Sequence, residues 1–224
     1  MNTIAPSIAC ADLLHLGEQI EYFDAAGIAW HHIDIMDGQF VPNFCLGTDL
    51  VRAIHAHSTS KQYVHLMARR PELHIQLLQR AGADYLAFHV ETTNTPFRIA
   101  NQIRDAGMRP AIAVNAITPL EPLEPLLAHV DAVTLMTIEP GIVGPTFMEL
   151  SYGRIEKLRK MIDRNDLNVK IEIDGGVNLE NAVRCLECGA DALVSGVHAL
   201  FRKGQTLEEQ MRQMKQILTE VGRQ

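Results

Sequence analysis

The chain has few cysteines, no long apolar run and no excess of basic residues, and each shortage excludes a class of protein. Four cysteines in 224 residues are too few and too scattered for the disulfide framework of a small secreted protein. The first residues lack the basic segment and apolar stretch of a secretory signal, and no window is long enough to cross a bilayer. The net charge of -7 argues against nucleic acid or an anionic membrane as the main partner, because both favour basic surfaces. We therefore expect a cytoplasmic protein.

Regular alternation of apolar and amphipathic segments is the main structural signal in the sequence. With 47% hydrophobic and 21% charged residues, the chain can bury one sizeable core, so one domain spanning residues 1–224 is expected. The apolar, β-branched segments predict eight strands, at residues 4–7, 30–35, 62–66, 85–88, 110–114, 132–136, 169–173 and 192–195. The amphipathic segments predict eight helices, at residues 13–26, 48–57, 72–81, 97–106, 120–128, 151–164, 179–188 and 207–221. Strict alternation predicts a parallel sheet, and eight repeats predict an α/β fold closed into a single (β/α)₈ TIM barrel.

Glycine follows four of the predicted helices, at Gly27, Gly82, Gly107 and Gly189. Glycine at that point suits the left-handed conformation that ends a helix, and the next predicted strand follows almost at once. The recurrence supports repeated helix–strand units, although unrelated helix ends in another α/β fold would give the same pattern.

Polar residues interrupt the second predicted strand, where an unpaired charge would be costly in a core. Side chains alternate along a strand, so His32, Asp34 and Met36 share one face, with Asp34 close to the C-terminal end. Parallel α/β sheets keep their chemistry at that end. Taken alone, the pattern is also compatible with a hydrogen-bonded core histidine and a capping aspartate.

Further ionisable residues fall at the C-terminal ends of other predicted strands, His65 on the third and Asp174 on the seventh, while His89 and Glu91 follow the fourth. Together with His32 and Asp34, His65 and Asp174 should converge on the mouth of a barrel. Two imidazoles and two carboxylates suit Zn²⁺, Fe²⁺, Mn²⁺ or Co²⁺. A second metal or redox site at Cys185 and Cys188 is less favoured, because this CxxC pair lies in a predicted helix without a partner pair.

Glycine-containing turns near the C-terminus are candidate anion sites. Gly175 and Gly176 lie between a predicted strand and a helix, and Ser195 and Gly196 precede a short helical segment. In barrels, the last two such loops often bind phosphate through backbone N–H groups. The same residues would also suit plain tight turns. Residues 139–147, rich in glycine and proline, form a candidate lid whose prolines limit its motion.

Five blocks of the sequence, in order and with similar spacing, resemble the signature blocks of the ribulose-phosphate 3-epimerase family, which includes allulose-6-phosphate 3-epimerases. The resemblance runs from about residue 4 to residue 201. The blocks are Pro6-Ser7-Ile8, residues 32–43, His65-Leu66-Met67, residues 136–141 and residues 174–177.

The resemblance implies a metal-dependent (β/α)₈ barrel that inverts C3 of a ketose phosphate. It implies one divalent metal ion per chain, of unknown identity and held by His32, Asp34, His65 and Asp174, and no organic cofactor. Asp34 and Asp174 would also be the catalytic acid/base pair that acts through an enediolate. The substrate-binding residues would be Ser7, Met36, Met67, Met136, Gly141, Gly144, Gly175, Gly176, Ser195, Gly196 and His198. Each methionine could instead be core filler.

The sequence departs from the family around the expected phosphate. The lid usually reads Pro-Gly-Phe-Gly-Gly-Gln, but here Val143 replaces a glycine and Pro145 replaces the glutamine. After the last strand a glycine–serine pair is common, whereas Val197 and His198 stand here. We expect a phosphorylated ketose with His198 as an added contact. The ribulose 5-phosphate/xylulose 5-phosphate pair, the allulose 6-phosphate/fructose 6-phosphate pair and less usual ketose phosphates all stay open.

Two other functions fit these residues less well. A decarboxylase or aldolase-like lyase on a similar barrel would need a lysine, but Met36 stands where an Asp-x-Lys-x-x-Asp pattern would place it. A non-catalytic sugar-phosphate sensor would have no need of two histidines and two aspartates together. The expected partner is therefore a small sugar phosphate, and a homo-oligomer is compatible with the sequence.

Overall fold

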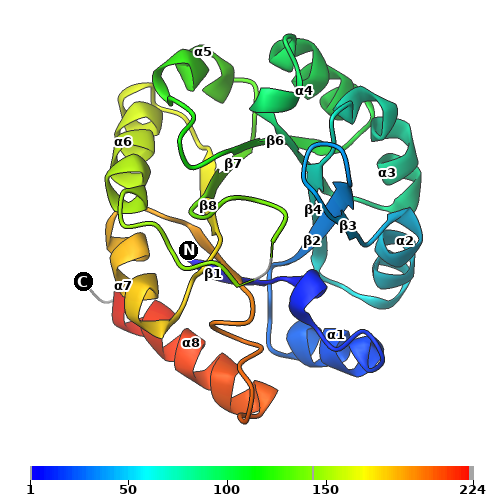
Figure 1. Ribbon diagram of the computed structural model, residues 1–224, viewed down its shortest axis with the longest axis vertical. Coiled ribbons are helices and arrows are strands. Elements are labelled where there is room, and N and C mark those ends of the chain that lie inside the picture. The colour runs from blue at the N-terminus through cyan, green and yellow to red at the C-terminus, as the bar shows by residue number, and fades with distance from the viewer. Residues whose placement is uncertain (1, 143, 222–224) are drawn as a thin grey trace.

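The computed structural model describes residues 2–142 and 144–221, and in them parallel strands form a ring surrounded by helices (Figure 1). Of the nine strands in this sheet, eight are parallel and β3 is antiparallel. The sheet order is β1-β9-β8-β7-β6-β5-β4-β2-β3, and a bridge between Ser7 and His32 joins β1 to β2. The predicted (β/α)₈ barrel is thereby confirmed. The strands are β1 (Thr3–Pro6), β2 (Trp30–Asp37), β3 (Phe44–Cys45), β4 (Lys61–Met67), β5 (Tyr85–His89), β6 (Arg109–Val114), β7 (Ala132–Met136), β8 (Lys170–Asp174) and β9 (Ala192–Ser195).

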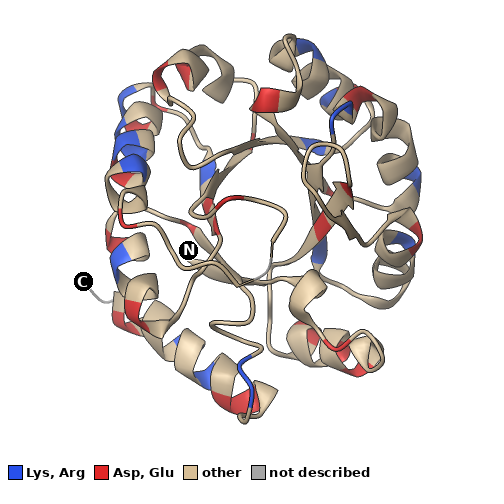
Figure 2. Ribbon diagram, in the orientation of Figure 1, with Lys and Arg blue, Asp and Glu red and all other residues tan. Residues whose placement is uncertain are grey.

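Each parallel strand is followed by a helix on the outside of the ring (Figure 1). The α-helices are α1 (Leu16–Ala25), α2 (Thr48–His57), α3 (Ile75–Ala81), α4 (Pro96–Asp105), α5 (Glu124–Leu127), α6 (Ser151–Arg164), α7 (Leu179–Glu187) and α8 (Leu207–Val221). Short 3₁₀ turns are η1 (Ile8–Cys10), η2 (Pro71–Leu73), η3 (Val90–Thr92) and η4 (Glu121–Leu123). Lys and Arg are interspersed with Asp and Glu on the outer helices (Figure 2). No helix in the described ranges is long and apolar enough to cross a membrane.

Three predicted helices differ from those observed. The helix expected at residues 13–26 begins at Leu16, because Leu13 and Leu14 lie in an exposed turn where Asp12 accepts the Leu14 amide. The segment 72–81 divides into η2 and α3. The segment 120–128 divides into η4 and α5, where Pro122 and Pro125 each remove an amide donor. The predicted left-handed glycines are confirmed, with φ of 73° at Gly27, 92° at Gly82, 85° at Gly107 and 107° at Gly189.

The core has two layers that follow from the alternation of side chains along the strands. Outward side chains such as Ile33, Val64 and Phe88 are fully buried beneath the helices. Inward side chains fill the N-terminal half of the barrel, where the Tyr63 ring stacks between Trp30 and Tyr85 at centroid distances of 6.0 and 5.3 Å. A filled lower barrel leaves the C-terminal half as the floor of a site.

Candidate active site and metal centre

Four side chains from three strands converge inside the C-terminal half of the barrel. Asp34 on β2 pairs in register with His65 on β4, and Asp174 reaches them from the end of β8. One ligand atom from each of these residues and His32 lies within 4.8 Å of all the others. The structure therefore brings together all four side chains that the sequence singled out as metal ligands.

Asp34 lies deeper than its predicted place at a strand end. The strand continues to Asp37 because Ile35 and Met36 pair with β4, and Met36 and Asp37 pair with the antiparallel β3. Asp34 is consequently only 7% exposed, near the floor of the barrel mouth.

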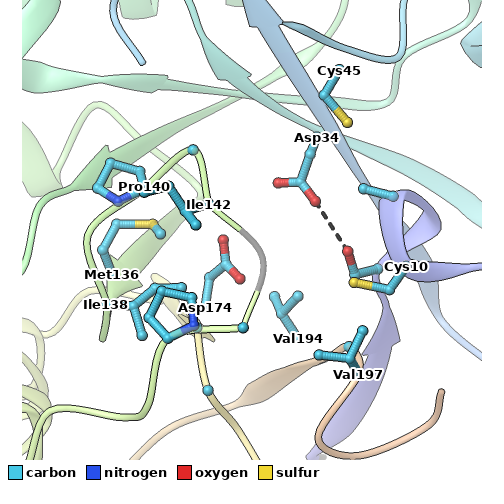
Figure 3. A pocket seen from close by; sticks show the side chains of 18 of the residues that line it. Cys10, Asp34, Cys45, Met136, Ile138, Pro140, Ile142, Asp174, Val194 and Val197 are labelled. Carbon is cyan, nitrogen blue, oxygen red and sulfur yellow. Dashed lines mark hydrogen bonds between the residues drawn. The ribbon is translucent and has the colours of Figure 1, made fainter. Parts of the chain in front are cut away.

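The distances within this group are those of hydrogen bonds or close ion pairs. Asp34 Oδ1 lies 3.2 Å from both His32 Nε2 and His65 Nδ1. Asp174 Oδ2 lies 3.5 Å from His32 Nε2 and 3.2 Å from His65 Nδ1. The Ser7 hydroxyl donates to Asp34 Oδ2 at 3.0 Å (Figure 3). The inner nitrogens of both imidazoles therefore face the same two carboxylates.

Glu172 holds His32 from behind. His32 Nδ1 lies 3.2 Å from Glu172 Oε2, and the fully buried Glu172 also accepts from Trp30 Nε1 at 2.9 Å and Thr134 Oγ1 at 2.8 Å. Sequence reasoning missed Glu172. The same alternation that picked out His32 and Asp34 could have found it, since Glu172 and Asp174 share a face of β8.

His65 is held from behind by a second histidine. Its Nε2 lies 2.9 Å from His89 Nε2, and His89 Nδ1 lies 3.2 Å from Glu91 Oε2. Burial, with a further contribution from His65, lowers the pKa of His89 to about 4, so its ring is neutral. The sequence placed both residues after the strand, whereas His89 is the last residue of β5 and Glu91 lies in η3; the sequence alone gave them no role.

Charges within the group stabilise one another. Burial would raise the pKa of Asp34 and Asp174, but the neighbouring His32 and His65 outweigh it and lower both. Burial would lower the pKa of His32, yet Glu172, Asp34 and Asp174 raise it well above its usual value. The pKa of His65 is also raised, because its hydrogen bonds to Asp174 and Asp34 outweigh burial. The two carboxylates are thus anionic and attract positive charge to the space between them.

The proton positions on the histidine rings indicate whether these four residues suit a metal ion. Glu172 is a carboxylate that can only accept, so His32 Nδ1 carries the proton and a neutral His32 directs the Nε2 lone pair at Asp34 and Asp174. A lone pair and a carboxylate oxygen repel, so without a metal the ring takes up a second proton, as its raised pKa indicates, and a bound cation can replace that proton. Two imidazole nitrogens and two carboxylate oxygens are a suitable set for a divalent transition metal. These residues therefore fit such an ion.

A cavity of about 250 Å³ opens above this group. Asp34 and Asp174 direct their carboxylates into it from different strands (Figure 3). Ser7 and three methionines line it as expected, together with Cys10, Cys45 and Asn43, which the sequence did not indicate. The methionines are Met36, Met67 and Met136.

The far end of the cavity is made of the expected turns. Its wall includes Gly141, Gly144, Gly175, Gly176, Gly196 and His198, with Pro145 and Val197 beside them. The His198 ring approaches the Gly144 carbonyl at 3.3 Å. Ser195 is outside this wall, since its buried hydroxyl donates to the Leu193 carbonyl at 3.1 Å. Val143 lies outside the described residues.

The candidate lid between β7 and α6 crosses the centre of the ring and is fixed where it begins and ends (Figure 1). The Thr137 amide donates to Asp174 at 2.8 Å, and the Met148 amide donates to Thr137 at 2.9 Å. At Gly176, φ is 65° and a Cβ atom would approach the Phe147 nitrogen to 2.5 Å. Glycine is required there because the lid packs directly on the β8–α7 turn.

The CxxC pair is remote from this site. Cys185 is buried in the core under α7, where burial raises the pKa of its thiol to about 12. Cys188 donates weakly to Glu156 at 3.6 Å. Among the described residues, the one group of three or more side chains able to hold a metal is that of His32, Asp34, His65 and Asp174. Reduced, packed thiols account for the pair.

Known proteins resemble both the sequence and the fold. Residues 3–201 match the model of the Ribulose-phosphate 3 epimerase family. A ribulose-phosphate 3-epimerase of Methanocaldococcus jannaschii is 39% identical over 91% of this chain and 86% of the relative. Another from Synechocystis is 40% identical over 86% of this chain and 85% of the relative. A tryptophan synthase α-subunit variant from Pyrococcus furiosus shares the fold, with a TM-score of 0.70 at 15% identity over 97% of this chain and 98% of that one. The resemblance found in the signature blocks is thus confirmed, and the chain belongs to the ribulose-phosphate 3-epimerase family.

Proposed function

We propose that this protein is a metal-dependent epimerase that inverts C3 of a ketose phosphate. The observation that carries the proposal is the pair Asp34 and Asp174, which enter one cavity from two different strands and share two imidazoles. A divalent metal held by His32, Asp34, His65 and Asp174 would stabilise negative charge on the substrate's C2 oxygen and so make the C3 proton removable.

The two aspartates would move protons on opposite faces of C3. One carboxylate removes the C3 proton and leaves an enediolate, and the other, protonated, returns a proton to the opposite face. These roles require the two groups to hold different protonation states. Asp34 accepts a hydrogen bond from Ser7, whereas the charge of Asp34 opposes ionisation of Asp174. Both carboxylates are anionic in the free site, so we assign to Asp174 the proton that the pair takes up for turnover.

The methionines supply an apolar wall around the reacting carbon. Met36, Met67 and Met136 line the cavity beside the two carboxylates and would exclude water from the carbanion. Met36 also occupies the position at which the alternative lyase would place its lysine. The cavity wall thus favours proton transfer over Schiff-base or decarboxylase chemistry.

The phosphate would lie at the far end, against the turns of β8 and β9. The amides of Gly176 and His198 make no hydrogen bond to other described residues and can serve as donors to an anion. Val197 and Pro145 give this end less donor capacity than the usual family pattern, and the His198 ring stands at the same place. Ribulose 5-phosphate and allulose 6-phosphate are both candidate substrates.

Replacing His198 by alanine should raise KM for the phosphorylated ketose about tenfold and change kcat little. The reason is that a charge-assisted hydrogen bond to phosphate is worth about 1.5–3 kcal/mol and is similar in ground and transition states. Steady-state kinetics measures both constants, and His57→Ala on the exposed face of α2 is the matched control. An equal efficiency of the wild type with the free ketose would contradict the phosphate site.

The proposed reaction is tested by supplying the zinc- or manganese-loaded protein with a panel of ketoses and ketose phosphates in D₂O. Proton NMR should reveal the C3 epimer of one phosphorylated ketose, with deuterium introduced at C3 alone. Carbon–carbon cleavage or loss of carbon dioxide would instead support the lyase. Binding of a sugar phosphate with no change at C3 would support the sensor.

A further inference from the structure

A line of hydrogen bonds leads from His65 to the rim of the barrel. His65 Nε2 lies 2.9 Å from His89 Nε2, and His89 Nδ1 lies 3.2 Å from Glu91 Oε2. Glu91 is fixed in turn, because its Oε1 accepts from the Asn115 amide at 2.8 Å and from the Thr118 hydroxyl. We call His65, His89 and Glu91 the histidine relay.

Chemistry allows one arrangement of protons along the relay. Glu91 can only accept, so His89 Nδ1 carries a proton. The neutral His89 ring then has a lone pair at Nε2, which accepts from His65 Nε2. His65 must therefore leave its Nδ1 without a proton whenever it is neutral, and this is the nitrogen that faces Asp34 and Asp174.

We propose that Glu91 and His89 are positioning residues that fix the tautomer and ring orientation of His65, so that its Nδ1 lone pair is presented to the metal. The inference rests on the proposed metal site. His32 reaches a carboxylate directly at Glu172, whereas His65 reaches one only through a second imidazole.

Packing keeps the relay in this one geometry. His65 and His89 are both fully buried, and their rings lie end to end, with a centroid distance of 5.0 Å and an interplanar angle of 27°, as a hydrogen bond between the facing nitrogens requires. Phe40 packs against the His89 ring at 4.6 Å. A buried ring that is bonded at both nitrogens and packed against Phe40 cannot easily turn to exchange Nδ1 and Nε2. The proton on the nitrogen that faces Glu91 therefore determines which nitrogen of His65 faces the metal as a lone pair.

Glutamine at position 91 should reverse the relay without changing its shape. The Asn115 amide requires an oxygen at the Oε1 position, which leaves the glutamine NH₂ facing His89 Nδ1. The NH₂ donates, so His89 Nδ1 becomes an acceptor and His89 Nε2 becomes the donor to His65. His65 then carries its proton on Nδ1, where it competes with the metal. Alanine, in contrast, leaves space for water, which can accept from His89 and preserve the original arrangement.

The test compares zinc affinity of the wild type, Glu91→Gln, Glu91→Ala and Glu91→Asp by competition with a chelator. We expect Glu91→Gln to weaken zinc binding about 10- to 100-fold, as is typical when the hydrogen-bond partner of a ligand is lost. Glu91→Ala should weaken it less, and Glu91→Asp, which restores a carboxylate, should lie nearest the wild type. Glu121→Gln, at an exposed carboxylate paired with Lys157, is the matched control and should bind as the wild type does.

A merely structural role for Glu91 predicts the opposite order, with alanine worst and the isosteric glutamine mild, and that result would overturn the relay. Nitrogen NMR of the zinc-loaded wild type should identify His89 as protonated at Nδ1, and Glu91→Gln should move that proton to Nε2. An unchanged His89 tautomer in Glu91→Gln would also overturn the inference. Failure of the wild type itself to bind zinc would instead remove the proposed metal site, and the relay with it, so the two failures are distinguishable.

Discussion

Asp174→Asn is expected to lower kcat about a thousandfold while much of the metal stays bound. Asparagine keeps an oxygen at the position of the lost carboxylate, and the three other ligands are unchanged, but its amide cannot give or take the proton at C3. Turnover is measured at saturating metal, with metal content determined on the same sample. Asp163→Asn, at an exposed carboxylate on α6, is the matched control.

This variant should also separate the two halves of the reaction. Asp34 remains and keeps its hydrogen bond from Ser7, so it should still exchange the C3 proton of one epimer with solvent while epimerisation stops. Turnover near that of the wild type would exclude Asp174 from proton transfer. Equal loss of exchange from both epimers, with metal retained, would show that Asp174 does not act on one face only.

His65→Ala is expected to have the second large effect, on metal content. It removes a nitrogen that faces both aspartates and leaves their charges without one of the two imidazoles that lower their pKa. Metal affinity should fall by more than the about 10- to 100-fold that follows loss of a ligand's outer hydrogen-bond partner.

Elemental analysis after dialysis measures this effect, and circular dichroism checks that the barrel still forms. His57→Ala, exposed on α2, should retain the wild-type metal content. Full metal retention in folded His65→Ala would place the metal elsewhere. The four convergent side chains would then be a cluster of charged groups without a metal.

The barrel could be predicted from the sequence because its signal is local. Strands and helices alternate with clear periodicity, and glycines such as Gly82 mark where each helix ends. The short strand β3 could not be predicted, because its two residues pair with Met36 and Asp37 only after the chain turns back. That pairing extends β2 to Asp37, beyond the residues that pair with β4. Pro122 and Pro125 gave a sufficient local sign that the fifth helix would be divided.

The sequence predicted those features of the candidate site that follow from the ends of the strands and from the alternation of side chains along a strand. These two rules place His32, Asp34, His65 and Asp174 together, whichever helices surround them. They do not reveal which nitrogen of an imidazole faces inward, since that depends on partners such as Glu172 and His89 from other strands. The direction of the Ser195 hydroxyl was also missed, because it donates to the Leu193 carbonyl two residues earlier in the chain.

The early time course of the wild-type reaction in D₂O, started from one pure epimer, reveals whether Asp34 and Asp174 act on opposite faces of C3. If they do, the product epimer should carry one deuterium at C3 from the first turnovers, while the remaining substrate still carries hydrogen there. Product that retains the original hydrogen at C3 would contradict proton transfer by two groups, because a single group would then have carried the same proton from one face to the other.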